Sequence, residues 1–297
     1  MPDDTVIHVG GAMPDAGMLL QAINTIPLDG EGTIIVHGSV SYDEAATVNG
    51  GRVIAFLANN GDSPIWTRQN GVDSPQLAVN TGATVLFGGI QFSGNDSSSE
   101  PALRVNGGQV WVERGRIVWN DGGGIVVENS GALVLRNSFV GDGTNGDNAL
   151  TVDGASAEVL YSTLGTGFDN FGDVFPVFCI GNVTVSIRNS LLISLDDGEE
   201  LSCSMATVTN TASETLISGM GNVALGDVGM SWFVDITAGD FHLNNPPSIL
   251  ATTAVWETDV PIDIVGLEGI DDPSIDIDGE PRPDSDGTAD YTGADVP

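Results

Sequence analysis

Short apolar strands separated by small polar turns recur along the middle of the chain. The clearest unit is Gly124–Gly141, in which two apolar runs flank a turn of Asn, Ser and Gly. Each related unit reads as a strand, a turn, a second strand, another turn and one or two apolar residues. Five such units align: LAVNTGATVLFGGIQF from Leu77, LRVNGGQVWVERGRIVW from Leu103, IVVENSGALVLRNSFV from Ile125, LTVDGASAEVLYSTLG from Leu150 and FCIGNVTVSIRNSLLI from Phe178.

The period of these units predicts the fold class. The equivalent positions Val79, Val105, Val127, Val152 and Ile180 are 26, 22, 25 and 28 residues apart. A period of roughly 20–50 residues is typical of solenoids and propellers, but a propeller blade needs about 40 residues. The L-x-x-L-x-L pattern and helical return of leucine-rich repeats are missing. We therefore predict an all-β protein, a right-handed parallel β-helix of eight or nine coils stacked about 4.8 Å apart.

The flanking segments have a different pattern. Pro14–Ile26 places Leu19, Ala22, Ile23 and Ile26 on one helical stripe and ends before a proline. A lone amphipathic helix ahead of a solenoid covers the open edge of the first coil. We therefore expect three regions: an N-terminal strand and capping helix (1–32), the coils (33–245), and an irregular acidic segment packed on or capping the solenoid (246–297).

One turn column carries repeated asparagine. After the second strand, the five units place Gly88, Arg114, Asn137, Ser162 and Asn189 at the same position. Asparagine tolerates the left-handed backbone conformation that tight turns need. We expect an amide ladder here, in which each side chain bonds the backbone of the next coil.

Composition restricts the partners. The 297 residues include 41 Asp and Glu against 8 Lys and Arg, all eight of them Arg, for a formal net charge of −33. Such a surface repels nucleic acid and anionic membranes, and it favours a soluble monomer in a salt-rich or Ca²⁺-containing medium. No apolar run of about 20 residues is present, so no membrane span is expected. The opening residues lack a signal-peptide pattern, so an export signal is not expected in this chain.

The two cysteines, Cys179 and Cys203, lie about one coil apart. A disulfide between neighbouring coils in an oxidising compartment and a pair of buried free thiols both fit this spacing.

Two stretches resemble a known family. LLQAINTIP, GTIIVHG and GGRVIAFLA are similar in order and spacing to the start of pectin-lyase-like right-handed β-helix proteins. Residues 233–295, with GDFHL, DIDGEPRP and DYTGAD, resemble the tail of secreted bacterial surface β-helix proteins, with Asp295 where that tail usually has Glu. The resemblance implies an extracellular or cell-surface bacterial location. It also implies a fold that hosts polysaccharide lyases and inverting glycosidases, which alone does not establish an activity.

A binding surface is one candidate site. The strand pattern places Trp111, Glu113, Arg136, Tyr161 and Arg188 on one outward flank. Aromatic rings and arginine forks together recognise sugars and carboxylates. The alternative is structural, because Glu113 and Arg136 on adjacent coils would pair along the stack.

A cation site is the second candidate. Asp284, Asp286 and Asp290 alternate as the oxygen ligands of Ca²⁺ often do, although the distal Glu of an EF-hand is missing. A plain acidic turn is the alternative.

Catalysis has no comparable signal. His8, His37 and His242 are far apart in the sequence and form no metal-ligand or triad spacing. The G-H-G and R-I-K motifs of polygalacturonase-type enzymes are missing, and a carboxylate pair could be chosen freely from 41 acids. We therefore expect a secreted or surface-exposed scaffold or binding protein, directed at an extracellular polysaccharide, a surface partner or Ca²⁺. The alternative is a carbohydrate-active enzyme, either a polysaccharide lyase or an inverting glycoside hydrolase.

Overall fold

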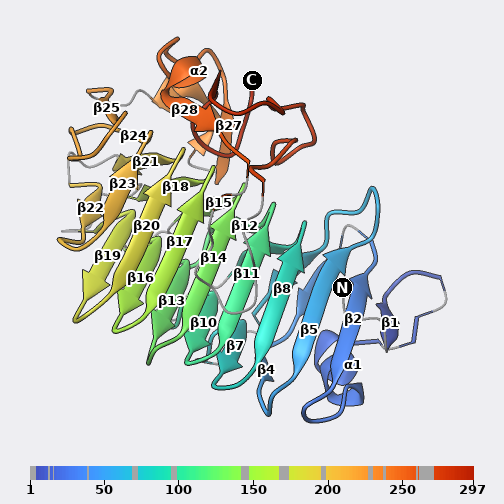
Figure 1. Cartoon of the computed structure of the whole chain (residues 1–297). Helices are drawn as coiled ribbons and strands as arrows, with labels where there is room; N and C mark the ends of the chain where they lie inside the picture. Colours follow the sequence, from blue (N-terminus) through green and yellow to red (C-terminus); the bar gives the residue numbers. More distant parts are fainter. Residues whose placement is uncertain are drawn as a thin grey trace.

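The computed structural model describes residues 5–12, 14–15, 17–38, 40–68, 73–94, 99–141, 147–166, 174–194, 199–226, 230–236, 239–258, 260 and 271–297. The chain forms a parallel β-helix with three sheets along its sides (Figure 1). In the described part of the chain, two sheets have nine strands and one has seven. Seven turns contain all three sheets and partial turns lie at both ends, so the expected eight or nine coils were a slight overestimate.

We name the sheets in the order in which the chain visits them. Sheet A contains β1 (Val6–Val9), β2 (Glu31–Val36), β5 (Val53–Ala58), β8 (Thr84–Gly88), β11 (Gln109–Glu113), β14 (Ala132–Arg136), β17 (Ser156–Leu160), β20 (Thr184–Arg188) and β23 (Thr207–Thr209). Sheet B contains β3 (Ser41–Asp43), β6 (Ile65–Thr67), β9 (Gln91–Phe92), β12 (Arg116–Ile117), β15 (Phe139–Gly141), β18 (Thr163–Thr166), β21 (Leu191–Ser194), β24 (Ala212–Ser213) and β25 (Val223–Ala224). Sheet C contains β4 (Ala46–Val48), β7 (Leu77–Asn80), β10 (Leu103–Asn106), β13 (Ile125–Glu128), β16 (Leu150–Asp153), β19 (Val177–Ile180) and β22 (Leu201–Ser202).

The predicted valine column is confirmed in four of its five units. Val79, Val105, Val127 and Val152 pair in register along sheet C and are fully buried. The next residue in this column is Cys179 and not Ile180, which is 45 % exposed. Cys179 is bonded to Cys203 on the neighbouring coil, so a disulfide takes the place of a valine there.

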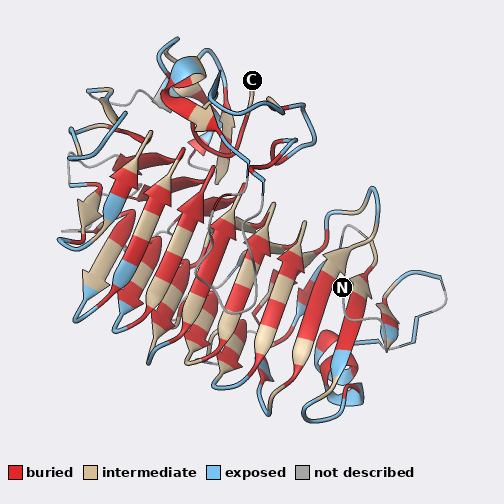
Figure 2. Ribbon diagram, in the orientation of Figure 1, coloured by how far each residue is buried: buried red, intermediate tan, exposed pale blue. Residues whose placement is uncertain are grey.

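In most strands of sheets A and C, alternate residues fill the interior, and Figure 2 shows banding of buried and less buried positions. Near the N-terminal end, Phe56, Trp66, Phe87 and Phe92 form an aromatic stack with ring centroids 5.2–5.5 Å apart. Because one coil cannot bury its apolar face alone, this core exists only through stacking.

Helix α1 (Leu19–Thr25) covers the first coil, as predicted, and it buries Leu19, Ala22 and Ile23 in the interior. Its start is fixed from outside the helix, because the buried carboxylate of Glu44 accepts hydrogen bonds from the backbone N–H groups of Leu19 (2.7 Å) and Leu20 (2.8 Å). A carboxylate at the N-terminus of a helix accepts hydrogen bonds from backbone N–H groups that have no partner within the helix. Its negative charge also interacts favourably with the positive end of the helix dipole.

The turn between sheets A and B contains a ladder of hydroxyls. The Oγ atoms of Ser138, Ser162 and Ser190 accept hydrogen bonds from the backbone N–H groups of Gly115 (2.9 Å), Ser138 (3.3 Å) and Ser162 (3.2 Å). Each hydroxyl also donates to the carbonyl two residues before it. The ladder that we expected from asparagine amides is therefore made by hydroxyls.

The residue before each position of this ladder, from Gly115 to Thr211, has a left-handed backbone. Arg114, Asn137, Tyr161, Asn189 and Asn210 occupy this column with φ between 46° and 54°. Ser162, which we had placed in the asparagine column, thus lies one position later, and Tyr161 takes its place. A shift of one residue moves a side chain to another face of the sheet. Because of this shift, Tyr161 is buried and does not lie on the outward flank.

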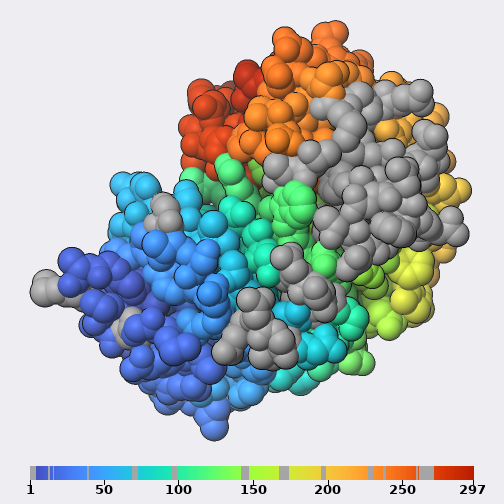
Figure 3. Space-filling model, turned by 180° about the vertical axis from the view of Figure 1, so that it is seen from behind, coloured from blue at the N-terminus to red at the C-terminus, as the bar shows by residue number. Residues whose placement is uncertain are grey.

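The last stacked strand ends at Ala224, and the remaining elements lie along the side of the β-helix (Figures 1 and 3). We call the described residues of 230–297 the C-terminal segment. It contains η1 (Met230–Trp232), β26 (Phe233–Asp235), β27 (Asp240–Leu243), α2 (Leu250–Thr253), β28 (Ala254–Trp256) and β29 (Thr288–Asp290). The hairpin β26–β27, whose residues we had counted with the coils, is antiparallel.

A second apolar core joins the C-terminal segment to the outer side of sheet B. Phe139, Leu191 and Ile193 of the sheet pack with Phe241 and Leu250 of the segment, and all five are at most 1 % exposed. The segment therefore covers the side of the middle turns. No helix in the described residues is both long and apolar enough to cross a membrane.

Candidate functional site

The predicted binding flank is divided into two groups. On sheet A, Arg136 Nε lies 3.1 Å from Glu113 Oε2, which is the ion pair along the stack that we weighed as the structural alternative. Trp111 packs beside this pair against Val134 and Leu160. Burial raises the pKa of Glu113, and the neighbouring Arg136 partly offsets that shift.

Arg188 and Tyr161 lie under the C-terminal segment instead. Arg188 forms a two-bond contact with the buried Asp272 and a weaker one with Glu257, at 3.3 Å. Tyr161 is fully buried, with the guanidinium of Arg282 4.6 Å from its ring centroid. Burial, followed by the charge of Asp272, raises the pKa of its hydroxyl. These two residues hold the segment and do not join Trp111 in one surface.

The predicted cation ligands also have separate partners. Asp290 is buried and pairs with Arg282 at 3.1 Å. Asp286 accepts hydrogen bonds from the backbone and hydroxyl of Thr258, whereas Asp284 is exposed and contacts Ser285. A Ca²⁺ site needs six to eight oxygens converging on one point. The three carboxylates do not show that arrangement.

A cleft of about 410 Å³ lies between the turns of the N-terminal coils and the C-terminal segment. We call it the Arg114 cleft. Its walls come from the turn after β5, the turn after β8, the turn after β11 and the start of the DIDG motif. The lining residues are Ala58–Pro64, Gly88–Gln91, Arg114, Arg116, Ile277 and Asp278. Most of them offer amides, hydroxyls, charges or bare backbone, so the cleft is polar.

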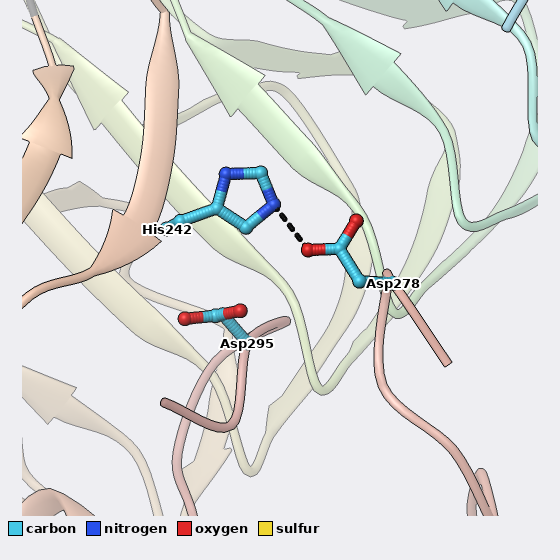
Figure 4. Close-up of side chains that lie close together, drawn as sticks. All are labelled: His242, Asp278 and Asp295. Atoms are coloured by element: carbon cyan, nitrogen blue, oxygen red, sulfur yellow. Dashed lines mark ion pairs between the residues drawn. The ribbon is translucent and has the colours of Figure 1, made fainter. Parts of the chain in front are cut away.

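His242 belongs to an ionic network that includes the cleft residues Arg116 and Asp278, and Figure 4 shows its ion pair with Asp278. Its Nε2 lies 2.6 Å from Asp278 Oδ2, and its Nδ1 contacts Asp240. Arg116 Nη2 lies 2.8 Å from the other oxygen of Asp278. The network joins sheet B, hairpin β26–β27 and the DIDG motif.

The charges of this network support one another. Burial lowers the pKa of His242, but the hydrogen bonds that its ring donates to Asp278 and Asp240 outweigh burial and raise that pKa to about 9. The same contact with His242 lowers the pKa of Asp278. At neutral pH we therefore assign an imidazolium between two carboxylates.

This protonation also bears on metal binding. His242, Asp278 and Asp295 bring their potential ligand atoms within 4.8 Å of one another (Figure 4). A metal requires the neutral imidazole, and both ring nitrogens of His242 already face carboxylates. Asp295 accepts a hydrogen bond from Leu243 N at 2.6 Å. The arrangement fits a structural ion-pair network better than a metal centre.

The cleft offers no described carboxylate suited to act as a general acid. Its two lining carboxylates are Asp62 and Asp278, and the pKa of each is lowered. A backbone N–H donor, followed by Asn59, causes the shift at Asp62. A glycosidase acid needs a raised pKa so that it stays protonated at its working pH.

Sequence reasoning missed this region because its residues come from distant parts of the chain. We judged the three histidines unrelated, yet β1 and β2 place His8 Nδ1 2.7 Å from His37 Nε2, and His242 meets acids 36 and more residues away. One sequence signal could have located this region. GDFHL, DIDG and GAD all lie in residues 233–295, the stretch that resembles the tail of secreted bacterial surface β-helix proteins.

No protein-family model matches the chain, and no curated protein matches it. The parallel β-helix predicted from the repeats is confirmed by the stacked parallel sheets, whereas membership of the pectin-lyase-like family stays a prediction.

Proposed function

We propose that this chain is an exported or cell-surface β-helix scaffold that binds a glycan in the Arg114 cleft. The observation that carries the proposal is the polar lining of the cleft, with Asn59, Asn60, Ser63 and Gln91 beside two arginines. Amides, hydroxyls and charged forks placed on a rigid frame orient sugar hydroxyls. The cleft lies on turns of stacked coils, which are held by the repeating register of the sheets.

Two features support an extracellular location. The disulfide Cys179–Cys203 joins neighbouring coils, and such bonds persist mainly in oxidising compartments. The net charge of −33 and the absence of lysine suit a protein that stays soluble outside the cell. Labelling of surface-exposed protein on intact cells of the source organism would test this proposal, and exclusive recovery in the cytosol would reject it.

A catalytic role is the weaker candidate. The described carboxylates of the cleft have lowered pKa values, and Glu113 is paired with Arg136 away from the cleft lining. We therefore favour binding over turnover.

The proposal is tested by a glycan array probed with the purified chain, with and without Ca²⁺. We expect binding to one glycan class that is unchanged by EDTA. Reducing-sugar and unsaturated-product assays on the same glycans should show no turnover. Enzymatic turnover would overturn the scaffold interpretation, and an array without any bound glycan would reject glycan binding.

A substitution in the lining of the Arg114 cleft tests whether the glycan binds there. Gly89 lines the cleft with φ of 71°, and a side chain added there would meet Ala58 and strain the backbone. Gln91→Glu in the cleft is the milder change, and Gln109→Glu on the adjacent coil of sheet A is the matched control outside the lining. We expect only the cleft variant to weaken glycan binding.

A further inference from the structure

The eight arginines of this acidic chain differ in one respect. All eight lie in described residues, and seven form side-chain hydrogen bonds or ion pairs. Within the described part of the chain, Arg114 is the exception. Arg114 lines the Arg114 cleft, and its backbone N–H bonds the carbonyl of Arg136 at 3.2 Å.

The acids nearest to Arg114 in sequence and in the cleft have other partners. Glu113 pairs with Arg136, although the charge of Arg114 also helps to lower its pKa. Asp278 is held by Arg116 and His242, and Asp62 accepts a hydrogen bond from Asn59 at 2.8 Å. In a chain with about five acids for each base, a cleft arginine that forms no ion pair among the described residues is unexpected.

The backbone at Arg114 makes the choice of arginine more informative. Its φ is 53°, and the equivalent residues on later coils include Asn137, Asn189 and Asn210. Asparagine adopts this left-handed conformation more readily than a long side chain does. Tyr161 also holds this conformation, but it is buried under the C-terminal segment. Arg114 lines the cleft instead, and strained residues concentrate at functional sites.

We infer that Arg114 receives an anionic substituent of the bound glycan, a carboxylate or a sulfate ester. This inference rests on the proposed glycan binding. The planar guanidinium offers a fork of donors that matches two oxygens of either group. Asn60 and Gln91 also line the cleft, where they can contact the sugar hydroxyls. Because the net charge of −33 repels long polyanions, the ligand carries isolated charges and not a dense series of them.

The test uses Arg114→Asn, which removes the guanidinium and keeps a residue that later coils already accept at this turn. The matched control is Arg104→Gln. Arg104 loses the same charge but lies on β10 of sheet C, paired with Glu100 and Glu128. The probes are glucuronate, galactose 6-sulfate and neutral galactose. Binding is followed by NMR through the Arg114 side-chain N–H signal and the Gly61 and Gly89 amide signals.

We expect one anionic probe to shift these signals saturably, and the choice between carboxylate and sulfate follows from which probe does so. Arg114→Asn should weaken that binding by about 10- to 100-fold, the usual loss for a hydrogen bond to a charged group, and Arg104→Gln should leave it unchanged. If neither anionic probe shifts the signals, or if Arg114→Asn binds as well as the wild type, the inference is overturned. Equal binding of neutral glycans by both proteins would reject the anionic substituent while leaving glycan binding intact.

Discussion

The interior of the β-helix and its junction with the C-terminal segment are both apolar, but they are stabilised differently. In the interior, successive coils repeat the same contacts. One example is the column of equivalent buried valines in sheet C, formed by Val79, Val105, Val127 and Val152. At the junction, each polar contact occurs once and joins residues far apart in the chain. The comparison indicates that stability of the coils is shared along the stack, whereas attachment of the segment depends on a few single contacts.

The junction also buries pairs of opposite charge. Arg282 has a side chain with 0 % exposure and pairs with Asp290, and Asp272 pairs with Arg188 while 2 % exposed. Buried pairs add little net stability, but loss of one partner is costly because the other charge stays buried. We expect these pairs to fix where the segment sits.

The largest effect is expected in the interior. Phe56→Ala removes a fully buried ring that stacks on Phe87, with ring centroids 5.3 Å apart, and lies tilted against Trp66 at 5.5 Å. The cavity should lower the free energy of unfolding by about 3–5 kcal/mol, measured by urea denaturation with circular dichroism. A loss below about 1 kcal/mol would contradict a core shared between coils.

A somewhat smaller and more local effect is expected at the junction. Asp290→Asn leaves Arg282 buried without its charge partner, at a cost of about 3 kcal/mol. The segment should become sensitive to protease while the β-sheet circular dichroism stays unchanged. Asp286→Asn, an exposed position near the same strand, is the control with the same change of charge. If Asp290→Asn loses its β-sheet circular dichroism when its segment becomes sensitive to protease, the segment and the coils unfold together.

The smallest effect is the pH dependence of the junction. The pKa of His242 is raised from 6.5 to about 9, so the folded state binds the proton more tightly than the unfolded chain. Its contribution is complete below about pH 6.5 and is lost as the pH rises through about 9. The pKa of Asp278 is lowered from 3.8, so its contribution is present above that value and is lost under more acidic conditions.

Protease release of the segment should therefore increase above about pH 8, and His242→Gln should remove this alkaline dependence. The interior, measured by circular dichroism over the same range, serves as the internal reference. A wild-type profile that matches the His242→Gln profile would exclude the imidazolium from the attachment.

The periodic part of the molecule could be predicted from the sequence, because a repeated strand pattern implies a repeated coil. The prediction failed where the spacing changed by one residue. We aligned Tyr161 with Arg136, but the residue that pairs with Arg136 in the sheet is Leu160. The turn residues Tyr161 and Ser162 are equivalent to Asn137 and Ser138 instead. Aligning the ladder serines would have placed Tyr161 in the buried left-handed turn and not on the outward flank.

The junction could not be predicted in the same way. Nothing in the local sequence relates Arg188 to Asp272, or Arg116 to His242 and Asp278, because these pairs depend on where a non-repetitive chain returns to the coils. The asparagines illustrate the difference. We expected Asn137 and Asn189 to bond the next coil, but their amides donate to the carbonyls of Ile275 and Val255 in the segment.

These single contacts also depend on the number of coils between them. The segment touches Arg116 on one coil and Arg188 three coils later, and Asn137 and Tyr161 in between. Duplication or deletion of a coil, the usual way in which repeat proteins change length, would move these attachment points by about 4.8 Å per coil. Changes in coil number should therefore be tolerated on the N-terminal side of Arg116 and selected against between Arg116 and Arg188, which makes the segment a gauge of solenoid length.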